Sequence, residues 1–152
     1  MPAPPPTDPS ATGMQASLSA ASPPATTPKD EFELGRGYFQ HKDYSRAADT
    51  FRRFLHQYPS DRLTPEAQYW LGESLFDGRQ YHDAAEAFLK VSTKYQTNAR
   101  APDALLRLGE SLSAMGQKEA ACASLGEVLR KYPRATLSVK ESVARDQKRA
   151  HC

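Results

Sequence analysis

The stretch "AQYWLGESLFDGRQYHDAAEAFLKV", Ala67 to Val91, decides the fold because its pattern occurs three times in the chain. A shift of 37 residues aligns a Leu-Gly pair, an apolar residue three places after the glycine, an alanine, a large apolar residue, a tyrosine and an opening proline. The aligned positions are Leu34, Leu71, Leu108; Gly35, Gly72, Gly109; Tyr38, Leu75, Leu112; Ala47, Ala84, Ala121; Phe51, Phe88, Leu125; Tyr58, Tyr95, Tyr132; and Pro28, Pro65, Pro102. This agreement predicts three copies of one structural unit.

Each unit is predicted to be a pair of helices, because its apolar positions recur at three- and four-residue steps. In the middle unit Pro65 suits the first helical turn, with Thr64 as its N-cap. Helix A then runs to about Phe76, and helix B covers roughly residues 81–95. Turn residues occupy 41–43, 77–80 and 115–118, between the two helices of each unit.

The glycine inside helix A is predicted to mark a close approach of helix B. A helical glycine costs about 1 kcal/mol relative to alanine, so its occurrence in every unit indicates that a Cβ does not fit. The small residues at 47, 84 and 121 suit the other side of that contact, and the large residues at 51, 88 and 125 suit the space beyond it.

The two ends of the chain depart from the repeat. Residues 1–28 hold eight of the twelve prolines and no Lys, Arg or aromatic residue, which predicts a disordered linker. We expect the chain to be a fragment of a longer protein. The repeat region 29–138 divides at about 28–64, 65–101 and 102–138. Arg145 and Asp146 replace the Leu-Gly pair of a fourth unit, so 139–152 is predicted to be a polar capping helix and tail.

Composition and motifs argue against several functional classes. The balance of 20 basic and 18 acidic residues leaves a formal charge of +2, too weak to indicate nucleic-acid binding. No apolar run is long enough to span a membrane, and no signal peptide is visible. The sequence has no phosphate-binding glycine loop, no zinc motif and no nucleophile motif, and its histidines are scattered. We therefore expect no enzyme, no cofactor and no metal site.

The two cysteines are too few for a disulfide framework. Cys122 occupies the position that Ala48 and Ala85 fill in the other units, which favours a small buried thiol. Cys152 is expected to be free at the terminus, with an intermolecular disulfide in an oxidising compartment as the alternative.

The Leu-Gly pair in helix A, the alanine and aromatic in helix B and the following Tyr-Pro resemble the tetratricopeptide repeat, whose usual unit is about 34 residues. The resemblance covers about 29–138 and implies an all-α superhelix of three helix-turn-helix units plus the capping helix. "AQYWLGESLFDGRQYHDAAEAFLKV" and "APDALLRLGESLSAMGQKEAACASLGEVLRKYP" also resemble the C-terminal domain of the YbgF/CpoB family. Members of that family are periplasmic and act with the Tol-Pal system in cell division.

The family resemblance implies a non-enzymatic interaction module that coordinates peptidoglycan synthesis with outer-membrane constriction. Its expected partners are TolA and the peptidoglycan synthesis machinery, and its expected compartment is the periplasm. An oligomer would form only through a coiled coil that this chain lacks. The alternative is a repeat scaffold in outer-membrane protein or lipoprotein assembly, held by surface packing.

The predicted partner-binding surface is the concave face, which helix A lines in tetratricopeptide solenoids. If Leu71 and Gly72 face helix B, a 100° step per residue turns Tyr69, Glu73 and Phe76 the opposite way. The predicted site residues are Phe32, Arg36, Phe39, Tyr69, Glu73, Phe76, Asp77, Leu106 and Glu110. This face would be aromatic near its N-terminal end and acidic toward its C-terminal end, which predicts a partner with apolar anchors followed by Lys or Arg.

Two points on this face stay open. The aromatic residues could instead pack between repeats, and Trp70 could either brace a neighbouring repeat or clamp a ligand. The basic clamp of chaperone-binding tetratricopeptide domains would need Lys and Asn where this chain has Glu73 and Glu110. A co-chaperone for Hsp70 or Hsp90 is therefore disfavoured.

Overall fold

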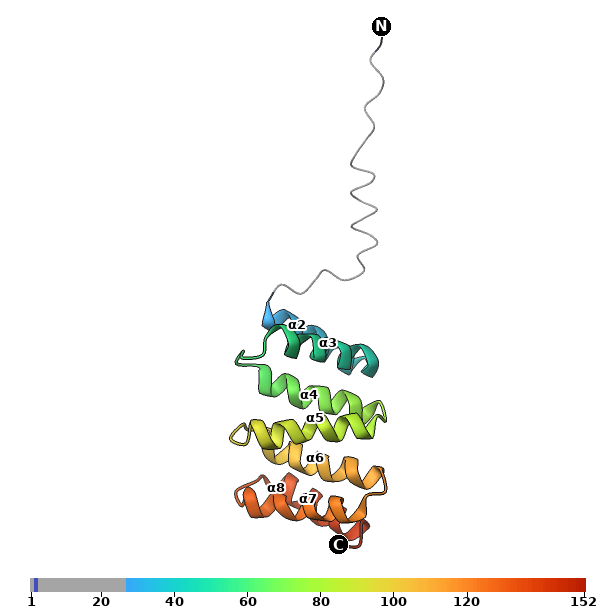
Figure 1. The fold of residues 1–152 in the computed structure, drawn as a ribbon, viewed down its shortest axis with the longest axis vertical. Helices are drawn as coiled ribbons and strands as arrows, with labels where there is room; N and C mark the ends of the chain where they lie inside the picture. The colour runs from blue at the N-terminus through green and yellow to red at the C-terminus, as the bar shows by residue number, and fades with distance from the viewer. Residues whose placement is uncertain (1, 3–26) are drawn as a thin grey trace.

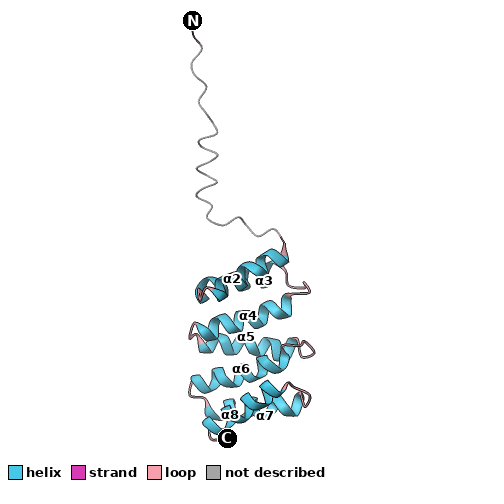
Figure 2. Cartoon of the chain, turned by 180° about the vertical axis from the view of Figure 1, so that it is seen from behind, coloured by secondary structure: helices cyan, strands magenta, loops and turns pink. Residues whose placement is uncertain are grey.

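The computed structural model describes Pro2 and residues 27–152, and this part of the chain contains helices and loops but no strand (Figures 1 and 2). The helices are α2 (Pro28–Gln40), α3 (Tyr44–Gln57), α4 (Thr64–Asp77), α5 (Tyr81–Lys94), α6 (Ala101–Ala114), α7 (Lys118–Lys131) and α8 (Leu137–Arg149). The predicted linker, apart from Pro2 and its last two residues, lies outside the described residues. None of the described helices has the length and apolar character that crossing a membrane requires.

The helices form three antiparallel hairpins stacked along one axis, with α8 at the C-terminal end (Figure 1). The predicted all-α repeat superhelix with a capping helix is confirmed. Helices α2, α4 and α6 are the first helices of the three repeats, and α3, α5 and α7 are the second.

The turn inside each hairpin has the same geometry. Lys42, Arg79 and Gly116 occupy equivalent positions and have φ angles of 60°, 62° and 74°. The next residue's amide closes the turn by donating back across five residues, as from Gln80 to the carbonyl of Leu75 at 2.8 Å. The left-handed conformation disfavours side chains, and only the third repeat has glycine there.

The predicted close approach at the helix-A glycine is confirmed, and the structure identifies what fills the space. A Cβ added to Gly72 would lie 2.5 Å from Cε1 of Phe88, and one added to Gly35 would lie 2.8 Å from the Phe51 ring. The large residue of helix B, more than its alanine, therefore occupies the space beside the glycine. Phe51 and Phe88 are fully buried, so neither ring has room to move away.

The loops between repeats correct one sequence prediction. Thr64 is the first residue of α4 and not its N-cap; its buried hydroxyl donates to the carbonyl of Tyr58 at 2.6 Å. In the same loop Asp61 Oδ1 accepts a hydrogen bond from the amide of Leu63, a side-chain-to-backbone turn in which Asp and Asn are favoured. Asn98 makes the equivalent bond in the next loop. The threonine thus ties helix α4 to the end of α3.

Candidate functional site

The face formed by α2, α4 and α6, called here the helix-A face, contains the nine predicted site residues, but the structure divides them into two groups. Phe32, Tyr69, Glu73 and Leu106 are buried, with 6 or 7% of their surface exposed. Arg36, Phe39, Phe76, Asp77 and Glu110 are half-buried and reach the surface. The second group supplies most of the accessible surface of this face, and its role in binding stays a prediction.

The buried group corrects the expected orientation of Phe32 and Tyr69. The ring centroid of Tyr69 lies 5.8 Å from that of Phe88 in α5, and Phe32 lies 5.8 Å from Phe51 in α3. Phe32 therefore packs inside its own helix pair. Tyr69 packs on Phe88 but also contacts the guanidinium of Arg100, 5.0 Å from its ring centroid, at the start of α6. Burial raises the pKa of Tyr69, and the nearby carboxylate of Glu73 adds to the shift.

Trp70 braces neighbouring repeats. Its ring lies 5.1 Å from the Phe39 ring of α2 in an edge-on arrangement. The guanidinium of Arg36 lies 5.2 Å above the same indole, and that of Arg100, at the start of the third repeat, lies 5.8 Å away. Such cation–π contacts contribute about 0.5–1 kcal/mol each where they are exposed. Trp70 remains half-buried, so it also forms part of the outer surface.

The arginines of this face differ in their ionic partners. Arg100 pairs with Glu66 at 3.4 Å, across the second and third repeats. Arg36 has no carboxylate partner among residues 27–152 and lies against Trp70. The N-terminal end of the face, within these residues, therefore offers an aromatic surface with an unpaired cation.

Glu73 and Arg107 form a largely buried ion pair between α4 and α6. Arg107 donates from Nε to Glu73 Oε1 at 2.8 Å and from Nη2 to Oε2 at 3.1 Å. The guanidinium also lies 4.6 Å from the Phe76 ring centroid. Burial raises the pKa of Glu73, although Arg107 opposes the shift. The pair neutralises the acidic charge predicted at Glu73 and joins the two repeats.

Glu110 lies next in this network and is strongly perturbed. Arg107 Nη1 is 3.7 Å from Glu110 Oε1, and Asp146 of α8 lies on the other side. Burial, and then the charge of Asp146, raise the pKa of Glu110 to about 7 in spite of Arg107. Asp146 Oδ2 is itself buried without a hydrogen-bond partner among the described residues.

A polar recess of about 260 Å³ opens at this C-terminal end, between α4, α6 and α8. Burial also raises the pKa of Asp103 on its wall, although Arg100 opposes the shift. The recess is lined by Tyr69, Asp103, Leu106, Arg107, Glu110, Ser138, Val139, Ser142 and Arg145. Its α6 wall contains two carboxyl groups, Asp103 and Glu110. Arg107 and Arg145 also line the recess, but each is paired with a carboxylate outside the lining, Glu73 and Asp146. The α6 wall therefore suits a cationic or amide group of a partner better than a carboxylate.

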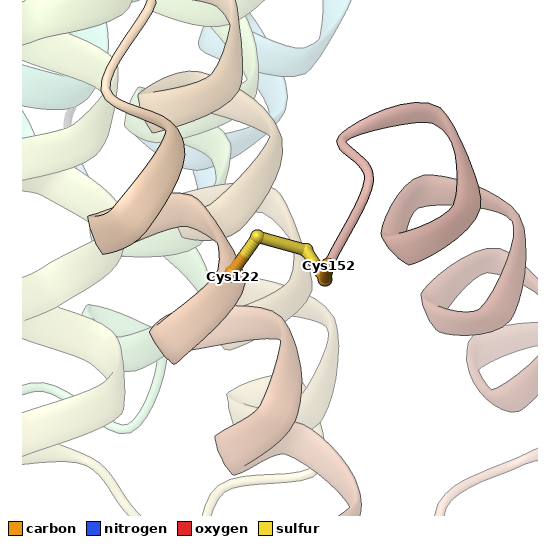
Figure 3. The surroundings of a disulfide bond; sticks show 2 residues. All are labelled: Cys122 and Cys152. Atoms are coloured by element: carbon orange, nitrogen blue, oxygen red, sulfur yellow. A yellow bond between two sulfur atoms is a disulfide. The ribbon is translucent and has the colours of Figure 1, made fainter.

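The cysteines correct the sequence prediction most clearly. Cys122 of α7 and Cys152, after α8, form an intramolecular disulfide with their Cα atoms 5.5 Å apart (Figure 3). Neither is a free thiol, and Cys122 is half-buried. The bond was missed because α8 folds back along α7, a placement that the repeat alignment does not contain.

Arg100 and Arg107 were missed as members of the site, although the sequence contained a signal for them. Both pair with a glutamate 34 positions earlier, Glu66 and Glu73. Arg36 and Trp70 have the same separation. A residue in the first helix of one repeat therefore contacts the residue 34 positions later, in the first helix of the next repeat. This separation is three residues, almost one helical turn, shorter than the 37-residue repeat.

Comparisons with known proteins agree with this architecture. Family models of the tetratricopeptide repeat match residues 32–99 and 103–135, which together form more than half of the chain. No curated protein sequence matches the chain.

Several solved structures have a similar fold. The second TPR domain of human RPAP3, in complex with the HSP70 peptide SGPTIEEVD, superimposes with a TM-score of 0.65 at 15% identity over 83% of this chain and 99% of that chain. The Sgt2 TPR domain from Aspergillus fumigatus superimposes with a TM-score of 0.67 at 17% identity, over 88% of this chain and 83% of that chain. The first TPR of Spaghetti (RPAP3), bound to the HSP90 peptide SRMEEVD, superimposes with a TM-score of 0.64 at 16% identity, over 84% of this chain and 96% of that chain. At these identities the similarity concerns the fold.

Proposed function

Because the chain belongs to the tetratricopeptide-repeat family, we propose that its helix-A face binds an extended segment of a partner protein. The single observation that carries the proposal is the half-buried surface of Arg36, Phe39, Trp70 and Phe76. Arg107, which lies against Phe76, also lines the polar recess beside Glu110. Half-buried aromatic side chains are typical anchors of protein interfaces.

The charges of the face define the chemistry of this partner. Arg36, which pairs with no carboxylate among residues 27–152, suits an acidic group. The two carboxyl groups on the α6 wall of the recess, Asp103 and Glu110, suit Lys or Arg. Between them Phe39 and Phe76 offer apolar contacts. We therefore propose a segment with an acidic end, apolar anchors and a basic end, which adds the acidic end to the sequence prediction.

We further propose that the protein acts in the periplasm, in the Tol-Pal system, as the YbgF/CpoB resemblance implies. Its partners would be TolA and the peptidoglycan synthesis machinery, and its role would be to coordinate that synthesis with outer-membrane constriction. The intramolecular disulfide supports an oxidising compartment, since such bonds are rare in the cytosol.

The test is capture of TolA from a periplasmic extract by the immobilised full chain and by a Phe39→Ala/Phe76→Ser double variant. Serine is the residue that the third repeat has at the position of Phe76. The control is Leu89→Ala, which removes a 48% exposed apolar side chain from α5, on the opposite helix of the repeat.

We expect the double variant to lose at least about tenfold in affinity, equivalent to about 1.4 kcal/mol, while its helical circular dichroism is retained. The control should bind as the parent does. Full capture by a folded double variant would refute the assignment of the helix-A face. Loss of capture in the Leu89 variant alone would instead favour a scaffold held by the outer helices.

A further inference from the structure

Helix α8 stands where the first helix of a fourth repeat would lie, but it has little apolar attachment. Only Val139 and Val143 are buried among its 13 residues, whereas α6 buries seven of its 14. None of the described helices pairs with α8 as a second helix of its own unit, and Leu137 is 70% exposed. Hydrophobic burial alone therefore holds α8 weakly.

Charge also works against the docked position of α8. It brings Asp146 beside Glu110 of α6, and Asp146 Oδ2 is buried without a hydrogen-bond partner among residues 27–152. Arg145 Nε lies 3.8 Å from Asp146 Oδ1, and Arg107, which contacts Glu110, is already bound to Glu73. Docking therefore brings two carboxyl groups together in a buried place, and they repel each other unless one of them holds a proton.

The disulfide supplies the attachment that packing does not. It joins Cys152, which follows the end of α8, to Cys122 near the start of α7, and it closes a loop with a sequence separation of 30 (Figure 3). Cys152 is exposed and Cys122 is half-buried, so a small dithiol can reach the bond. Accessible disulfides of this kind are the ones that exchange readily with thiols.

We propose that the Cys122–Cys152 disulfide is a redox latch for α8. A dithiol opens it: one thiolate attacks the sulfur of one cysteine, the Cys122–Cys152 bond breaks, and the other cysteine leaves as a thiolate. The second thiol of the reagent then attacks the reagent's own sulfur in this mixed disulfide and displaces the first cysteine. The products are two cysteine thiols in this chain and one disulfide in the dithiol, which is oxidised by two electrons. Helix α8 then leaves α6 and α7.

Release of α8 would reshape the candidate binding site. Ser138, Ser142 and Arg145 form one wall of the polar recess, and all three leave with the helix. Glu110 would then face solvent and lose its contact with Asp146. This consequence for partner binding rests on the proposed function, whereas the latch itself does not.

The experiment is hydrogen exchange of the full chain, followed by mass spectrometry, with and without dithiothreitol. We expect reduction to speed exchange of the amides in residues 137–149 by roughly 100-fold, the scale set by loss of loop closure, while α4 and α5 keep their protection. A Cys122→Ser/Cys152→Ser variant should show the fast exchange without reductant and no response to dithiothreitol.

Each other outcome overturns the latch or the site. Unchanged protection of 137–149 after reduction would mean that packing alone holds α8. Loss of protection throughout α4 and α5 would mean that the bond stabilises the whole domain instead. A change in α8 exchange without any effect of the Phe39/Phe76 variant on TolA capture would keep the latch and reject the proposed function.

Discussion

Replacing Gly72 by alanine should destabilise the domain, although alanine is the better helix former. The new Cβ would lie 2.5 Å from Cε1 and 2.7 Å from Cδ1 of Phe88, well inside van der Waals contact. The Phe88 ring is fully buried, so relief requires α4 and α5 to move apart. Overpacking of this kind costs about 1–3 kcal/mol, and the helix propensity of alanine returns about 1 kcal/mol. Since the contact lies at the severe end, we expect a net loss of about 1–2 kcal/mol.

The measurement is urea unfolding, followed by circular dichroism at 222 nm, with Gly126→Ala as the matched control. Gly126 lies in α7 and is exposed, and a Cβ added there would meet no atom within 4 Å. Its replacement should therefore stabilise by about 0.5–1 kcal/mol. Both substitutions thus replace a helical glycine by alanine, but we expect them to change the free energy of unfolding in opposite directions. A Gly72→Ala protein as stable as the parent would refute the close-approach argument.

The remaining predictions concern charge and turns. Arg107→Met should lower the free energy of unfolding by about 3–5 kcal/mol, because it leaves Glu73 buried without a counter-ion; adding Glu73→Gln should restore at least half of the loss in urea titration. Because the pKa of Glu110 is raised to about 7 by burial and by Asp146, its contribution favours folding below pH 4.5 and is lost as the pH rises through 7. Glu110→Gln should flatten that slope and stabilise at pH 8 by about 1–2 kcal/mol, with no gain at pH 4; an unchanged pH profile would contradict this. Arg79→Gly relieves a left-handed φ of 62° and should raise the free energy of unfolding by up to about 1 kcal/mol. The thermal midpoint should rise with it, and a lower midpoint would argue against strain at this position.

The helix pairs could be predicted from the sequence because their contacts repeat within each unit. Gly35 and Gly72 each meet the large residue sixteen places later, so a single alignment shows the contact in every copy. The positions of the turns could be predicted for the same reason, because they recur in every unit.

The candidate site could be predicted only in part, because its contacts run between units. A 37-residue alignment places Glu73 beside Glu110, whereas in space Glu73 meets Arg107, 34 positions later. The alignment therefore shows an acidic row where the structure has an ion pair. The 100° rule also made Tyr69 appear to face outward, but α5 is close enough for Phe88 to contact it.

The C-terminal end was the least predictable part, because nothing there repeats. A helix that lacks the Leu-Gly pair has no counterpart in the alignment, and its docking depends on Val139 and Val143 and on the disulfide. The N-cap of α8, where Thr136 accepts from the amide of Val139, is local and could have been recognised.

Trp70 gives the protein a built-in optical probe. It is the single tryptophan of the sequence, so all indole fluorescence comes from one known place. That place lies between two guanidinium groups, beside Phe39, on the surface that we assign to the partner. A bound segment that engages Arg36 alters the polarity around the indole, and its emission spectrum shifts. Affinity and kinetics at this face can therefore be followed in the unlabelled, unmutated chain.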